Sequence, residues 1–177
     1  MTEQGPKLEI GHVLALDIIG YSKLLMHEQS DRVKRLNMIV RATEQFRAAD
    51  AKGQLIRLPT GDGMVLVFRQ DPKAAIECAT QISAVLKSQP DIQLRMGIHS
   101  GPIEEVLDVN NQRNIAGAGI DLAQRVMDCG DAGHILLSRR VADDLAAYSH
   151  WNSYLHELRE CEVKHGRKIS LVNFYTG

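Results

Sequence analysis

The segment between residues 54 and 68 constrains the fold of this chain more than any other. Two strand-like runs, Gln54–Leu58 and Met64–Phe68, flank the pentapeptide Pro59-Thr60-Gly61-Asp62-Gly63. An Asp-Gly pair accepts the positive φ angles that tight turns require, so the sequence predicts an antiparallel hairpin with Asp62 at its apex.

Hydrophobic periodicity predicts the other elements. Val13–Leu16 is a short apolar run typical of a strand buried on both faces. Apolar residues at helical spacing predict one helix from Ser30 to Phe46, with Ser30 or Asp31 as its cap. Gly101-Pro102 is expected to break a strand that starts at Leu94. Further helices are expected after Asp71-Pro72, over Gly117–Met127 and over Ser138–Ala147, and further strands over Ile103–Val109, His134–Leu137, Leu155–Val163 and Ile169–Tyr175.

The order of these elements predicts an α+β fold, with a ferredoxin-like, antiparallel-rich sheet and helices packed on it. A length of 177 residues suits one compact domain. We expect residues 1–11 to form a polar N-terminal tail and residues 12–177 to form that single domain.

Composition excludes several classes of function. The formal net charge is −1, so the chain has no electrostatic footprint for nucleic acid or for an anionic membrane. Its longest apolar run is too short to span a bilayer, and no signal peptide is visible. Three cysteines without metal-ligand spacing favour reduced thiols that fill the core, and hence a cytoplasmic protein (Cys78, Cys129 and Cys161).

Two carboxylates are the candidate metal ligands. Asp17 ends the first predicted strand and Asp62 lies at the hairpin apex, so neighbouring strands would bring both to one rim of the sheet. Two converging carboxylates suit a pair of magnesium ions on a triphosphate, and Gly20 would let phosphate oxygens approach the backbone. The alternative is that Asp62 is only a turn residue and Asp17 only a strand terminator.

A second cluster lies between residues 114 and 125. Asp121 and Arg125 are four residues apart, so they project from one face of the predicted helix. Arg125 is suited to stabilise charge on a transferring phosphoryl group, although an ion pair with Asp121 on a solvated face is the commoner use of such a pair. Lys164, in a predicted turn, could hold a terminal phosphate or could be an ordinary surface lysine.

Four motifs in order resemble the catalytic domain of class III nucleotidyl cyclases. They are Leu16-Asp17-Ile18-Ile19-Gly20-Tyr21-Ser22, Pro59-Thr60-Gly61-Asp62-Gly63-Met64, Arg95-Met96-Gly97-Ile98-His99-Ser100-Gly101 and the segment Gly117–Arg125. The resemblance covers His12 to Tyr175 and implies a cyclase homology domain that converts a nucleoside triphosphate to a 3′,5′-cyclic monophosphate and pyrophosphate.

The resemblance also implies a role for each candidate residue. Asp17, Asp62 and the Ile18 carbonyl would bind two Mg²⁺ or Mn²⁺ ions, and Arg125 would stabilise the transition state. The substrate-binding residues would be Ile18, Ile19, Gly20, Tyr21, Ser22, Leu58, Asn114 and Lys164. Family members build this site across a head-to-tail dimer, so the resemblance implies a homodimer with Asp17 and Asp62 from one subunit and Arg125 from the other.

Three positions depart from the family pattern. Leu58 replaces a lysine that reads adenine, Asn114 replaces an aspartate or threonine, and Asp121 replaces an asparagine that helps to position the ribose. A site that lacks the hydrogen-bonding group which recognises a base discriminates between nucleotides differently. Specificity for a purine therefore does not follow from the family resemblance. The sequences of the segments Leu58–Met64 and Ala123–Gly133 resemble those of bacterial stand-alone pyrimidine cyclases of anti-phage signalling (Pycsar). This resemblance implies UTP as substrate, cyclic UMP as product and a role in antiviral defence.

Two other functions stay open on the sequence. One is an adenylate cyclase that makes cyclic AMP through a differently built base pocket. The other is a non-catalytic module of the same fold that binds nucleotide without turnover, motivated by Leu58 and Asp121. Retention of Asp17, Asp62 and Arg125 favours an active enzyme over this module.

Overall fold

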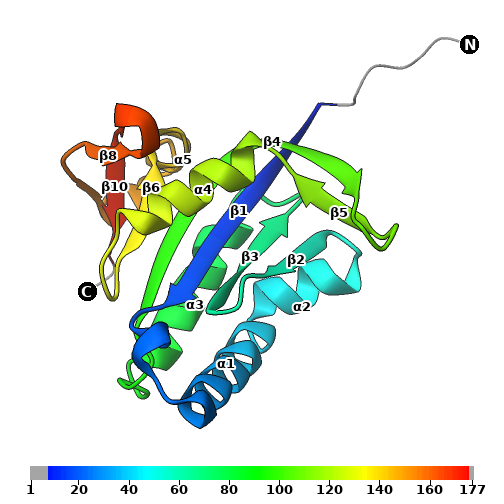
Figure 1. Ribbon diagram of the computed structural model, residues 1–177. Coiled ribbons are helices and arrows are strands. Elements are labelled where there is room, and N and C mark those ends of the chain that lie inside the picture. The colour runs from blue at the N-terminus through cyan, green and yellow to red at the C-terminus, as the bar shows by residue number, and fades with distance from the viewer. Residues whose placement is uncertain (1–7, 176–177) are drawn as a thin grey trace, which may run out of the picture.

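The computed structural model describes residues 8–175, and its main sheet has eight strands. The strands of this sheet are β1 (Glu9–Ile18), β2 (Leu55–Pro59), β3 (Gly63–Phe68), β4 (Leu94–Leu107), β5 (Arg113–Ala116), β6 (Ile135–Ser138), β7 (Leu155–Glu157) and β10 (Leu171–Phe174). Their order is β2-β3-β1-β4-β6-β10-β7, with β5 paired to the outer part of β4 (Figure 1). β4 and β6 are parallel, and the other pairs are antiparallel. The fold is therefore α+β with an antiparallel-rich sheet, as predicted.

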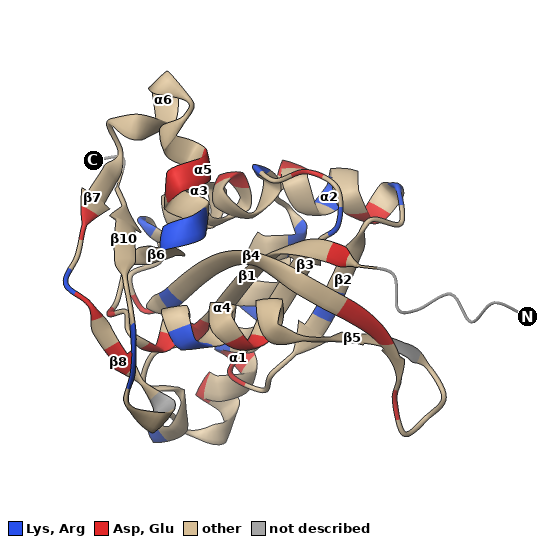
Figure 2. Ribbon diagram, turned by 90° about the horizontal axis from the view of Figure 1, so that it is seen from above, with Lys and Arg blue, Asp and Glu red and all other residues tan. Residues whose placement is uncertain are grey.

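Helices cover both faces of this sheet. They are α1 (Met26–Arg41), α2 (Glu44–Ala51), α3 (Ala74–Leu86), α4 (Ala118–Asp128), α5 (Arg139–Ala146) and the short α6 (Ser149–Asn152). α4 lies on one side of β1 and β4, and α2 and α3 lie on the other (Figure 2). Within the described residues, no helix is both long and apolar enough to cross a membrane.

The strand β1 is buried on both faces because its side chains alternate between two apolar clusters. Leu14, Leu16 and Ile18 pack in the larger cluster with residues of α1, α2 and α3. Val13 and Ala15 point the other way, into a smaller cluster beneath α4. α4 can lie directly on β4 because Gly97 has no Cβ. A Cβ at that position would come within 2.3 Å of the Met127 backbone nitrogen. β1 begins at Glu9, ahead of the His12 boundary that we expected between tail and domain.

The single helix predicted from Ser30 to Phe46 is wrong at its start and in its middle. α1 begins at Met26, where the Glu28 carboxylate accepts a hydrogen bond from the Leu25 N–H at 2.9 Å. The chain then turns at Thr43, whose hydroxyl oxygen accepts from the Phe46 N–H at 3.3 Å and starts α2. A capping threonine stabilises a new helix start, which hydrophobic periodicity alone does not reveal.

The predicted break at Gly101-Pro102 is also wrong, since β4 runs through it. β4 pairs with β6 at Met96–Ile98 and with β5 at Glu104–Leu107. Pro102 falls between these stretches and lies opposite Ile10 in the ladder with β1, so the β5 and β6 ladders do not need the N–H group that proline lacks.

The two strands predicted over Leu155–Val163 and Ile169–Tyr175 are each divided, and their parts pair in two separate ladders. β7 pairs with β10, while β8 (Cys161–Val163) and β9 (Arg167–Ile169) form a two-stranded sheet of their own. The 3₁₀ turn η2 (Lys164–Gly166) joins β8 to β9. We call residues 161–169 the β8–β9 hairpin.

The prediction of three reduced core thiols is wrong for two of them. Cys129 and Cys161 form a disulfide, with their Cα atoms 6.3 Å apart. Cys78 is free and fully buried. The disulfide joins residues 32 positions apart, so only the folding of α4 against the β8–β9 hairpin brings them together.

Candidate active site

The two candidate metal aspartates lie side by side at one rim of the sheet. Asp17 is opposite Gly63 in the β1–β3 ladder, and the Ile18 N–H donates to the Asp62 carbonyl at 2.8 Å. Gly63 is required here, because a Cβ at that position would lie 1.9 Å from the Leu16 carbonyl oxygen. The strand register therefore holds the hairpin apex against the end of β1, because β1 and β3 are neighbours, a condition that the sequence had left open.

An open cleft of about 590 Å³ lies over this rim. Gly20 lies in the wall of the cleft and has a left-handed backbone conformation, with φ of 72°. The 3₁₀ turn η1 (Tyr21–Lys23) follows it. The described backbone around Gly20 leaves free space, since a Cβ there would meet no atom within 4 Å. The cleft is lined by Asp17, Ile18, Ile19, Gly20, Tyr21, Ser22, Thr60, Gly61, Asp62, Arg95, Gly130 and Asp131.

Arg95 is a member of the site that the sequence analysis did not single out. Its Nε donates to Asp17 Oδ1 at 3.1 Å and its Nη2 donates to Asp17 Oδ2 at 2.7 Å. Asp17 is only 7% exposed, and a buried carboxylate is stable when it is paired in this way. Hydrogen bonding to Asp17 raises the pKa of the Arg95 guanidinium, so Arg95 stays charged. Only the strand register of the folded chain reveals this pairing, because Arg95 lies opposite Asp17 across β1 and β4.

The same carboxylates also border a groove of about 280 Å³ against α4. Thr60, Asp62 and Met64 form one wall, and Gln124 and Asp128 of α4 form part of the other. Asp128 lies 3.5 Å from Arg95 Nη2 through its Oδ1, so Arg95 bridges Asp17 and the end of α4. Gln124 and Asp128 were not predicted from the sequence.

The two predicted base-reading positions lie on β2 and β5. Leu58 is half-buried and packs against the apolar cluster beneath α4. Asn114 is half-buried, and its Oδ1 accepts a hydrogen bond from the Ile115 N–H at 2.8 Å. The Asn114 amide NH₂ therefore faces away from this bond and is the part of the side chain that can donate to a ligand.

The helix residues do not meet the aspartates within one chain. Asp121 is exposed and Arg125 is half-buried on α4, and no ion pair joins them among the described residues. Neither residue lines the cleft or the groove at Asp17 and Asp62. The side chain of Lys164 lies outside the described residues; its backbone begins η2.

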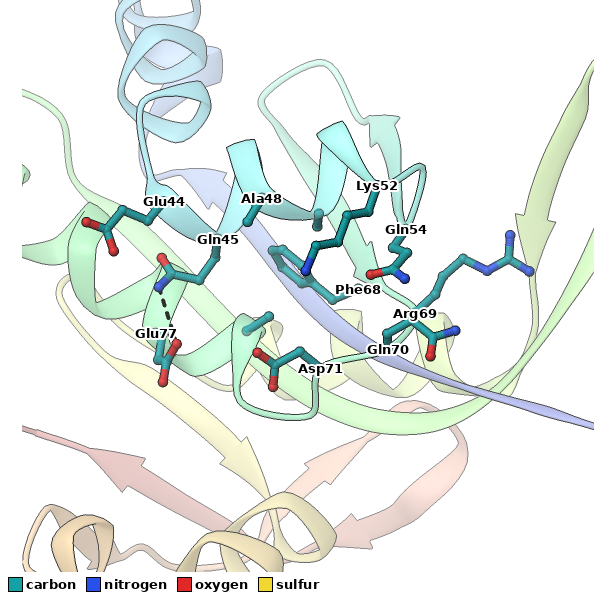
Figure 3. A pocket seen from close by; sticks show the side chains of 12 residues that line it. Glu44, Gln45, Ala48, Lys52, Gln54, Phe68, Arg69, Gln70, Asp71 and Glu77 are labelled. Carbon is teal, nitrogen blue, oxygen red and sulfur yellow. Dashed lines mark hydrogen bonds between the residues drawn. The ribbon is translucent and has the colours of Figure 1, made fainter.

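A separate pocket of about 250 Å³ lies between α2 and α3 (Figure 3). Its lining carries both charges, with Lys52 and Arg69 as well as Glu44, Asp71 and Glu77, and the Gln45 side chain donates to Glu77 at 3.3 Å. Figure 3 shows Gln45 and Glu77 pointing toward one another across the α2–α3 junction. None of the residues predicted as functional lines this pocket, so the candidate site is the cleft at Asp17.

The donor set at the rim fits divalent magnesium or manganese. Asp17 supplies carboxylate oxygens from the end of β1 and Asp62 from the adjoining β2–β3 turn, and hard oxygen donors are what these ions bind. The open space at Gly20 leaves room for phosphate oxygens beside them. Among residues 8–175, no group of three or more His, Cys, Asp and Glu side chains is placed to hold a metal ion.

An antiparallel-rich α+β sheet with one aspartate at a strand end and a second in the adjoining hairpin turn is the architecture of the class III cyclase catalytic domain. Residues 12–176 match the family model of the adenylate and guanylate cyclase catalytic domain, and the chain belongs to that family. It is a nucleotide cyclase domain by this membership.

Solved structures agree with the family. The adenylate/guanylate cyclase/hydrolase from Silicibacter pomeroyi is 25% identical, with a TM-score of 0.73 over 98% of this chain and 100% of that chain. The adenylyl cyclase CyaB from P. aeruginosa is 20% identical, with a TM-score of 0.73 over 97% and 96%. The guanylate cyclase domain of RhGC from Catenaria anguillulae, solved with GTP, is 20% identical, with a TM-score of 0.73 over 94% and 96%. No curated protein matches the chain.

Proposed function

We propose that this chain cyclises a nucleoside triphosphate, with UTP preferred, to the 3′,5′-cyclic monophosphate and pyrophosphate. The observation that carries the proposal is that Asp17 and Asp62 lie beside one another on a cleft that Gly20 also lines. We assign residues 12–177, together with residues 9–11 at the start of β1, to one catalytic domain.

Asp17, Asp62 and the Ile18 carbonyl would hold two Mg²⁺ or Mn²⁺ ions. When bound, such ions lower the pKa of the ribose 3′-hydroxyl and neutralise the phosphates. The residues Ile18 to Ser22 line the cleft and would hold the triphosphate. The 3′-oxygen would then attack the α-phosphorus, and the bond to pyrophosphate would break.

Arg95 would change partners during this reaction. Its guanidinium neutralises Asp17 through two hydrogen bonds, and a cation that binds Asp17 competes for the same oxygens. Arg95 would then be released towards Asp128, which already lies 3.5 Å away, or towards the substrate phosphates. Its raised pKa keeps the positive charge throughout.

The site would be completed by a second copy of the chain. Arg125, Asp121 and Asn114 line neither opening at Asp17 within one chain, which supports their contribution in trans. One matched structure is described as a non-canonical dimeric guanylyl cyclase domain, from Blastocladiella emersonii. In the proposed homodimer, Arg125 of one subunit stabilises the transition state at the aspartates of the other, and Lys164 holds the outgoing phosphates.

The side chains of Leu58 and Asn114 support a pyrimidine with a carbonyl edge as the base. Leu58 has no hydrogen-bonding group and packs on an apolar cluster, so it cannot read a purine as a lysine would. The Asn114 Oδ1 is engaged by the Ile115 N–H, which leaves the amide NH₂ as a donor. A donor suits the O4 of uracil and opposes the N4 amino group of cytosine, which supports UTP ahead of CTP.

The resemblance to pyrimidine cyclases of anti-phage signalling supports cyclic UMP as a second messenger in antiviral defence. We place this enzyme in the cytoplasm, where nucleoside triphosphates are made and used. A cyclic nucleotide released there would act on a separate receptor.

The test is product formation from ATP, GTP, CTP and UTP, each supplied alone with Mn²⁺ and resolved by mass spectrometry. We expect cyclic UMP as the main product. Cyclic AMP as the main product would overturn the choice of base and keep the cyclase chemistry. The absence of product from all four nucleotides, in protein shown to be folded and dimeric, would overturn the catalytic function.

A further inference from the structure

The disulfide joins the two segments that carry proposed phosphate-binding residues. Cys129 follows directly on α4, four residues after Arg125. Cys161 is the first residue of β8, three residues before Lys164. The covalent link therefore ties the end of α4 to the base of the β8–β9 hairpin (orange to red in Figure 1).

Few other contacts attach this hairpin to the domain. In the part of the chain that the structure describes, β8 and β9 pair only with each other and not with the main sheet. Ile169 and Cys161 pack as partly buried residues against a small apolar cluster of Val126, Leu136 and Leu171. A two-stranded ladder is marginally stable alone, so the disulfide is a principal restraint on this hairpin.

We propose that the Cys129–Cys161 disulfide is a reversible cross-link that positions the β8–β9 hairpin against α4, so that substrate affinity depends on the thiol oxidation state. The effect on substrate rests on the proposed cyclase function, through Lys164 on the hairpin that the cross-link holds against α4. Reduction by a dithiol transfers two electrons and two protons: the S–S bond breaks, two thiols form, and the reductant becomes a cyclic disulfide. A low-molecular-weight disulfide reverses the step and is itself reduced to two thiols.

Accessibility separates this pair from the third cysteine. Cys129 and Cys161 are only partly buried, so a small dithiol can approach the bond. Cys78, a residue of α3, is 0% exposed, and burial raises its pKa to about 11, so its thiolate is scarce at neutral pH. Disulfides in a reducing cytoplasm are commonly transient and redox-sensing, which fits a bond of this kind.

The experiment compares the full-length chain before and after treatment with a dithiol. Alkylation followed by mass spectrometry should show Cys129 and Cys161 protected before reduction and labelled afterwards. Hydrogen–deuterium exchange of residues 161–169 should then become faster by about fivefold or more, since local opening loses its cross-link. These two measurements are independent of catalysis.

The kinetic arm measures KM for UTP, or for whichever triphosphate is turned over. We expect reduction, or Cys161→Ser, to raise KM by on the order of 5- to 10-fold with a smaller change in kcat. Cys78→Ala is the matched control, whose KM should respond to the dithiol as the wild type does. Cys161→Ser should be insensitive to it, and circular dichroism checks that both variants fold.

Three results would overturn the proposal. One is labelling of both thiols without reduction after exposure to the oxidising disulfide, which would mean that the bond does not form. Another is unchanged exchange of residues 161–169 between the two redox states. The third is an unchanged KM in an active enzyme whose hairpin has loosened. A chain with no cyclase activity fails the proposed function instead, and the labelling and exchange measurements still decide whether the cross-link holds the hairpin.

Discussion

Arg95 of β4 caps the carboxylate of Asp17 on the neighbouring strand β1 through two hydrogen bonds of 2.7 and 3.1 Å. Asp17 is almost fully buried, so this arginine is what makes its charge tolerable in the absence of a cation. The candidate metal ligand is thus held in place and neutralised before any ligand binds. The following predictions test this arrangement and the rest of the site.

Replacing Arg95 by alanine should destabilise the fold and make it respond to divalent cations. The variant leaves Asp17 buried without its partner, which we expect to lower the free energy of unfolding by about 1–3 kcal/mol, since Arg95 is partly exposed. Added Mg²⁺ should restore more stability to Arg95→Ala than to the wild type, as followed by urea denaturation. Arg57→Ala is the control, because Arg57 pairs with Asp50 at 3.3 Å on the exposed surface and should cost less than about 1 kcal/mol. Equal responses to Mg²⁺ in both variants would contradict a cation site at Asp17.

Replacing Asp62 by alanine should abolish turnover and leave the fold intact. The side chain of Asp62 is only partly buried at a turn and has no role in the core, so thermal unfolding should change little. Asp131→Ala is the matched control, because Asp131 lines the same cleft but is not a proposed metal ligand. Product formation that persists in Asp62→Ala would refute the metal assignment.

Mixing two inactive variants tests whether the site lies between subunits. Arg125→Ala should lower kcat by on the order of 10²–10³, the usual effect of losing one transition-state contact. When Asp62→Ala and Arg125→Ala proteins are mixed, heterodimers regain one intact site, and activity should partly return. No recovery, with subunit exchange confirmed by mass spectrometry, would place the whole site in one chain.

His99 should make stability fall in acid. Its Nδ1 lies 2.7 Å from Ser138 Oγ in the interior, and burial lowers the pKa of His99 to about 4. The unfolded chain binds this proton near its ordinary pKa of 6.5. His99 therefore destabilises the fold progressively as pH falls from 6.5 to 4, by on the order of 2–3 kcal/mol in total. Urea denaturation of His99→Gln should show a flatter profile over this range, whereas His156→Gln, at an exposed position, should follow the wild type.

The sequence was sufficient for the elements whose signals are local. The Asp62-Gly63 turn, the apolar run of β1 and the helical stripe of α3 report backbone conformation and burial within a few residues, and all three elements form. The motif order led to the cyclase family, which the family model confirms. The prediction of a single helix missed the break at Thr43, because capping depends on one side chain rather than on periodicity.

Everything that joins distant segments was decided by the tertiary structure alone. The β1–β3 and β1–β4 registers put Gly63 and Arg95 on either side of Asp17, and packing of α4 on the sheet puts Cys129 beside Cys161. These contacts span 32 to 78 positions along the chain. Local propensity carries no information at such separations, because the pairing depends on which apolar faces pack together to exclude water.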